Sequence, residues 1–112
     1  TFFKINFKKI IMIHVVATIY IKKGKRNEFI EHLRTNITNV IAEKGCIEYS
    51  PAYDIDSQID NQVFNENRVT IVEKWKSIYS LQDHLQAPHM ISYRKKVKHL
   101  IEKTELSILS SI

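Results

Sequence analysis

The sequence is poor in residues that interrupt or cross-link a chain, since its 112 residues include one cysteine, two glycines and two prolines. Cys46 has no second cysteine to pair with, so an internal disulfide is excluded and a reducing, cytoplasmic location is the simpler expectation. The scarcity of glycine and proline favours long helices and strands. Apolar runs stay short of the roughly 20 residues that span a bilayer, so no membrane partner is expected.

Charge of one sign is in excess, because 17 Lys and Arg stand against 12 Asp and Glu, a formal net charge of +5. Such an excess is common in proteins that bind nucleic acid. Here the basic residues are spread over residues 1–9, 22–26 and 94–98, and aromatic residues do not alternate with them as a base-stacking surface requires. We therefore expect solvated helix faces and no nucleic-acid partner.

Hydrophobic periodicity predicts one domain over residues 12–112, opened by Met12, after an N-terminal extension of residues 1–11. Apolar residues at intervals of three to four predict helices over residues 27–44 and 78–85, and a third helix that begins at Pro88. Segments that alternate or are rich in β-branched residues predict strands over residues 12–21, 46–53, 68–75 and 104–109.

Single residues mark where these elements end. Gly45 is expected to stop the first helix in a left-handed conformation, and Ser77 to cap the second. Pro51 lacks a backbone N–H, which predicts that its strand lies at a sheet edge or is bulged there. Residues 54–67 are polar and aperiodic and should form a loop, with a short pairing around residues 62–64.

The order β-α-β-β-α-α-β predicts an α+β fold of the ferredoxin-like split βαβ type, with a four-stranded antiparallel sheet and helices on one face. Both faces of the sheet are apolar by sequence, so a second copy is expected to cover the face without helices and make a homodimer. In the first strand, one side would carry Ile13, Val15, Ala17, Ile19 and Ile21, and the other His14, Val16, Thr18 and Tyr20.

One segment, residues 69–93, gathers side chains suited to chemistry. The third strand ends with Glu73 and Trp75, and the two following helices carry His84, His89 and Tyr93. An acid, an indole, two imidazoles and a phenol suit an apolar pocket for a flat aromatic molecule, with groups able to move a proton. His84 and His89 are the candidate catalytic bases, because histidine titrates near neutral pH.

Each histidine also has a structural interpretation: His84 as a ring packed at a helix end, and His89 as a donor that stabilises a turn. The two histidines are five residues apart across a proline and not four apart on one helix face. Cys46 is the only thiol and is expected to be a small buried apolar residue. No metal site is therefore predicted.

The candidate substrate-binding residues are Tyr49, Glu73, Trp75 and Tyr93. Glu73 either orients a histidine or makes a structural bond to backbone or lysine. Trp75 is expected in the core and also as part of the pocket wall. Tyr49 and Tyr93 either donate hydrogen bonds to a substrate oxygen or lie half-exposed at a sheet edge.

Four pieces of sequence carry a family resemblance: MIHVVATIYIKKGK from residue 12, KGCIEYSPAYD from residue 44, VEKWKSIYSLQDHLQAPHMISY from residue 72 and ELSILSSI from residue 105. Through them the chain resembles the antibiotic biosynthesis monooxygenase family, and within it the small bacterial quinol monooxygenases. The resemblance implies a dimeric α+β barrel with a pocket between sheet and helices in each subunit. It also implies oxidation of a quinol or related phenol by dioxygen without metal, flavin or haem.

Two other groups of proteins with the same fold have different activities. In relatives that degrade haem, three characteristic positions would fall on Thr18 or a neighbour, His84 and Arg94, and all three residues differ from that pattern. A branch that processes a small signalling sugar derivative shares the His-x-x-x-Pro-His spacing found at His84–His89. The expected function is therefore a cofactor-independent monooxygenase, with a non-catalytic small-molecule-binding or stress protein, or an isomerase-like role on a phosphorylated sugar derivative, as alternatives.

Overall fold

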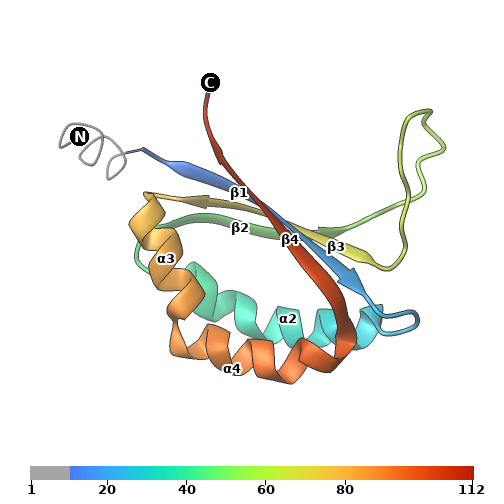
Figure 1. Cartoon of the computed structure of the whole chain (residues 1–112), viewed down its shortest axis with the longest axis horizontal. Helices are drawn as coiled ribbons and strands as arrows, with labels where there is room; N and C mark the ends of the chain where they lie inside the picture. The colour runs from blue at the N-terminus through green and yellow to red at the C-terminus, as the bar shows by residue number, and fades with distance from the viewer. Residues whose placement is uncertain (1–10) are drawn as a thin grey trace.

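The computed structural model describes residues 11–112 (Figure 1). The strands are β1 (Ile13–Ile21), β2 (Cys46–Tyr53), β3 (Arg68–Trp75) and β4 (Ile101–Ser110). The helices are α2 (Arg26–Ile41), α3 (Ile78–Gln86), α4 (Pro88–Val97) and the short 3-10 helix η1 (Lys98–Leu100). The predicted extension over residues 1–11 lies outside the described residues, apart from Ile11.

The strands form one sheet in the order β2-β3-β1-β4, and each neighbouring pair is antiparallel. Helix α2 connects β1 to β2, and the pair α3–α4 connects β3 to β4. Figure 1 shows the described α-helices on the same face of the sheet. The predicted α+β, ferredoxin-like fold is confirmed.

The core lies between this face and the helices. Residues of β1 alternate between buried and partly buried along its whole length, in the register that the sequence predicts. Trp75 at the end of β3 and Phe29 on α2 are fully buried. Burial of a large apolar side chain contributes about 1.5–3 kcal/mol, so these two rings are main anchors of the helical layer.

The predicted element boundaries agree closely with the structure at most ends. Ser77 caps α3, because its Oγ accepts a hydrogen bond from the Ser80 N–H at 3.2 Å. Helix α2 ends at Ile41, earlier than predicted, and a turn leads to Gly45 in the left-handed conformation at φ +92°. Strand β4 begins earlier than predicted, because the chain leaves η1 directly into pairing with Ile21.

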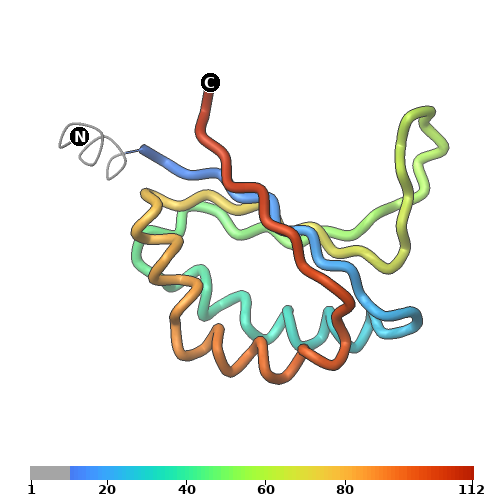
Figure 2. The backbone as a smooth tube through the Cα atoms, viewed as in Figure 1, coloured from blue at the N-terminus to red at the C-terminus, as the bar shows by residue number. Residues whose placement is uncertain are grey.

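One expectation about an irregular segment is confirmed and another is wrong. Strand β2 lies at the sheet edge, as Pro51 predicts, and its register shift falls between Cys46 and Glu48. Residues 62–64 form no strand; instead Gln62 accepts a hydrogen bond from the Ser57 backbone N–H at 3.1 Å. The loop of residues 54–67 projects well beyond the sheet (Figure 2).

The second face of the sheet is not covered by the described helices (Figure 1). Apolar Val72 and Leu109, 40% and 47% exposed, lie on it near Val16. On the same face Lys74 of β3 forms an ion pair with Glu48 of β2 at 3.3 Å. This face therefore carries charged groups as well as apolar ones. None of the described helices combines the length and apolarity needed to cross a membrane.

Candidate functional site

A cavity of about 750 Å³ lies between the inner face of the sheet and the helices α3 and α4. This volume falls within the roughly 300–1,000 Å³ typical of small-molecule sites. Most of the wall is apolar, and the predicted site residues that line it are His84, Tyr49, Glu73 and Tyr93. Two strands and two helices therefore bring these four side chains to one hollow.

His84 on α3 is held by an acid, Glu43, that no sequence motif marks. Its Nδ1 lies 2.6 Å from Oε2 of Glu43, which belongs to the turn between α2 and β2. Because an ionised carboxylate can only accept a hydrogen bond, Nδ1 carries the proton and Nε2 keeps its lone pair. Burial lowers the pKa of His84, opposed by the hydrogen bond and charge of Glu43. The ring is therefore neutral and able to accept a proton at pH 7.

Trp75 lies beside His84 and does not line the cavity. The two rings are 4.5 Å apart between centroids and tilted by 32°, while Tyr49 meets His84 edge-on at 5.9 Å. Such contacts restrict the orientation of the imidazole. With Glu43 on one nitrogen and aromatic rings around it, His84 has little freedom to rotate.

Glu73 faces the cavity from β3 and is 5% exposed. Its Oε1 accepts a hydrogen bond from Trp75 Nε1 at 2.9 Å. The partner of this oxygen is thus the indole two residues along the same strand face, and not the histidine, lysine or backbone group expected from the sequence. Burial raises the pKa of Glu73 to about 7; the bond from Trp75 opposes this, and the charge of Glu43 adds to it.

The two tyrosines supply hydroxyl groups to the cavity. Tyr49 on β2 is buried, and Tyr93 on α4 is partly buried, with its ring 6.5 Å from that of Phe29. Burial raises the pKa of both phenols well above the usual value, so both stay protonated at neutral pH. Each can then donate a hydrogen bond to an oxygen atom within the cavity.

His89, in the first turn of α4, is not part of the cavity wall. Its Nε2 lies 3.3 Å from the same Glu43 oxygen that contacts His84. Neither ring nitrogen of His89 completes a hydrogen bond, although both atoms are buried, so the contact with Glu43 is electrostatic and poorly aligned. His89 therefore acts on the cavity indirectly, through Glu43 and through its electrostatic effect on His84.

The sequence carries no local signal for Glu43, because its role depends on how the turn meets α3. Gly45 permits that meeting: a Cβ at this position would lie 2.3 Å from Ser80 Oγ. The Lys76 N–H donates to the Gly45 carbonyl at 2.8 Å and fixes the same approach. Within residues 11–112, no group of three or more His, Cys, Asp or Glu side chains is arranged to hold a metal ion.

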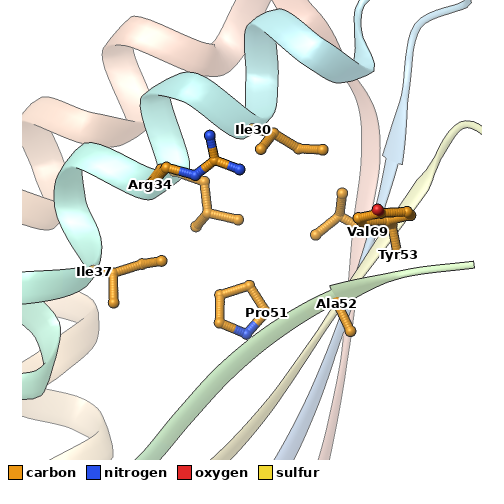
Figure 3. Close-up of a pocket in the computed structure, with 8 residues that line it drawn as sticks. Ile30, Arg34, Ile37, Pro51, Ala52, Tyr53 and Val69 are labelled. Carbon is orange, nitrogen blue, oxygen red and sulfur yellow. The ribbon is translucent and has the colours of Figure 1, made fainter.

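A second, smaller pocket of about 150 Å³ lies between α2 and β2. Figure 3 shows Ile30, Arg34 and Ile37 of the helix facing Pro51 of the strand. It lacks an acid–base pair, and its volume is below the range common for small-molecule sites. The larger cavity is the better candidate site.

Known proteins resemble this chain in sequence and in fold. The sequence model of the family described as "Antibiotic biosynthesis monooxygenase" matches residues 12–96. The "Probable quinol monooxygenase YgiN" of Escherichia coli (strain K12) is 30% identical over 100 residues, which cover 88% of this chain and 96% of that protein.

Solved structures give the same fold. A conserved protein from Methanosarcina mazei Go1 superposes with a TM-score of 0.78 at 26% identity, covering 96% of this chain and 99% of the other. A protein from Shewanella oneidensis superposes with a TM-score of 0.77 at 26% identity, covering 91% and 92% of the two chains.

Proposed function

The chain belongs to the antibiotic biosynthesis monooxygenase family, and from that premise we propose that it oxidises a quinol or related small aromatic molecule with dioxygen. The name of the Escherichia coli relative supports a quinol as the substrate. In the proposed reaction one quinol and one O2 give one hydroxyquinone and one water. One oxygen atom enters the ring, the other leaves as water, and the quinol supplies all the electrons.

The observation that carries this proposal is a neutral, oriented imidazole on the wall of an apolar cavity. His84 holds its proton on Nδ1 against Glu43 and offers Nε2 as a base. A phenolic group with a pKa of about 10 is a poor electron donor until it loses its proton. Removal of that proton by His84 makes the ring reactive toward dioxygen, and Glu43 stabilises the imidazolium that forms.

The remaining polar groups have supporting roles in this proposal. Tyr49, Tyr93 and Glu73 contact the substrate oxygens, because all three face the cavity. Trp75 acts by holding Glu73 and by packing on His84. We assign the second predicted base, His89, an indirect role through Glu43.

No metal, flavin or haem takes part in the proposed reaction, because the substrate itself is the reductant. The apolar wall keeps bulk water away from the reactive anion, which strengthens the electrostatic interactions at the oxygens.

We also propose that two copies associate through the uncovered sheet face, which would bury the exposed Val72 and Leu109. A reducing, cytoplasmic location is proposed on the grounds of the single cysteine, Cys46.

The proposal is tested by oxygen consumption with reduced menadione in the wild type, in His84→Ala and in His84→Ala combined with His89→Ala. Loss of a general base lowers the rate by roughly 10²–10⁴-fold, so both variants should fall close to the uncatalysed rate. His99→Ala, which removes a surface imidazole with a 66% exposed side chain, is the control and should keep full activity.

Two results would contradict the proposal. Equal rates in the wild type and the His84 variants would remove the proposed base. Tight binding of menadione without any oxygen consumption would favour the non-catalytic binding protein.

A further inference from the structure

Three cationic side chains lie on the wall of the same cavity: Arg94, Lys95 and Lys98. Arg94 and Lys95 belong to α4 and Lys98 opens η1. Residues three and four apart meet on one side of a helix, so Lys98 lies next to both of the others. The cavity therefore has a positively charged margin along one helical edge.

None of these cations forms an ion pair with any residue between 11 and 112. Other charged groups of the helices do pair, as Arg34 does with Glu31 at 3.0 Å. The acids on the cavity wall are Glu73, which bonds to Trp75, and Glu102 on β4. The positive charge at the margin thus exceeds the negative charge available to balance it.

Arg94 is held in place, because its Nη2 donates a hydrogen bond to the Leu85 carbonyl at 2.7 Å. The other donors of the guanidinium remain for a ligand, and a fixed guanidinium recognises an oxyanion better than a mobile one. The charge of Arg94 also contributes to the lowered pKa of His84, which places it within electrostatic range of the proposed base.

We propose that the substrate is an aromatic molecule that carries an anionic group, a carboxylate or similar oxyanion, bound by Arg94, Lys95 and Lys98 while the ring lies in the apolar part of the cavity. This inference rests on the proposed function for the identity of the ring, and it names the substituent. The cavity volume leaves room for a bicyclic ring with such a group.

Equilibrium binding tests this without turnover, by calorimetry with 1-hydroxy-2-naphthoate and with 1-naphthol at low salt. The wild type should bind the carboxylate about tenfold more tightly, the effect expected of two or three partly solvated charge contacts. Arg94→Gln combined with Lys98→Gln should remove this preference and leave the affinity for 1-naphthol unchanged. Lys22→Gln combined with Lys23→Gln removes the same charge from an exposed turn and should keep the preference.

Equal binding of the two probes by the wild type, or a preference that survives the Arg94 and Lys98 substitutions, would overturn the inference. Glucose 6-phosphate bound as tightly as the naphthoate would also overturn it, because the site would then select an anion without a ring. If the preference holds but 1,4-dihydroxy-2-naphthoate causes no oxygen consumption, the proposed oxidation fails and the ligand class stands.

Discussion

Glu43 contacts both histidines that the sequence marks as candidate bases, with one oxygen 2.6 Å from His84 and 3.3 Å from His89. The histidines could be found from the sequence, because histidine is the side chain that titrates near neutral pH. Glu43 could not be found in that way, since it lies 41 residues from His84 and their meeting depends on the packing of a turn against α3.

Glu43→Gln should lower kcat by about tenfold or more, with little change in KM, because the amide keeps the shape but not the charge that stabilises imidazolium. The pKa of His84 should fall further, because the Glu43 charge opposes the effect of burial. Nitrogen NMR of the His84 ring measures its pKa and tautomer directly. Glu31→Gln on an exposed part of α2 is the matched control, and an unchanged His84 titration in Glu43→Gln would contradict the assigned role.

Glu73→Gln should stabilise the protein at pH 8. Burial raises the pKa of Glu73 to about 7, above its unfolded value of 4.5, so the folded state binds more protons between these limits. The stability that Glu73 contributes is therefore complete below about pH 4.5 and is lost as pH rises to about 7. The free energy of unfolding of the variant should therefore be about 3 kcal/mol higher at pH 8, because each pKa unit corresponds to about 1.4 kcal/mol.

Urea unfolding of both proteins from pH 4.5 to 8 checks this. The histidines contribute equally to both free energies of unfolding, so the difference between the two proteins reports on Glu73 alone. A difference that does not depend on pH would show that Glu73 has its ordinary pKa.

At the scale of elements, the sequence predicts strands better than turns. Alternation fixes β1 and β3 almost to the residue, because each inner position must reach the core. Strand β2 lies at the sheet edge, as Pro51 predicts, and its register shift near Cys46 has no local signal in the sequence. The early start of β4 depends on pairing with Ile21, which is a long-range contact with no local signature.

Gly45→Ala should destabilise the protein far more than Gly24→Ala. Both glycines have positive φ, +92° and +78°, so each alanine carries a backbone cost of about 1–2 kcal/mol. A Cβ at Gly45 would also lie 2.3 Å from Ser80 Oγ, whereas nothing lies within 4 Å of one at Gly24. The comparison of melting temperatures therefore separates the steric clash from the backbone strain.

Gly45→Ala should also reduce activity in the fraction that remains folded, because the clash displaces the turn that carries Glu43 from α3. Equal melting temperatures for the two variants would contradict the prediction, because α3 and the turn could then move apart without loss of stability.

At the scale of the whole molecule, the proposed dimer depends on the uncovered sheet face. Val72→Lys places a charge at the centre of that face, and a buried unpaired charge is costly, so the dimer should dissociate. Ile41→Lys, at the 57% exposed end of α2, is the matched control and should remain a dimer. Size-exclusion chromatography with light scattering at micromolar concentration measures both, and a monomeric wild type would contradict the dimer.

The contact between Trp75 and His84 has an optical consequence. Trp75 is the single tryptophan of the sequence, it is fully buried, and its ring lies 4.5 Å from the imidazole. Indole emission is quenched by a nearby imidazolium but much less by a neutral ring. The intrinsic fluorescence should therefore dim as His84 takes up a proton, and the dimming should be absent in His84→Gln. The protein thus contains its own spectroscopic reporter for the protonation state of its proposed base.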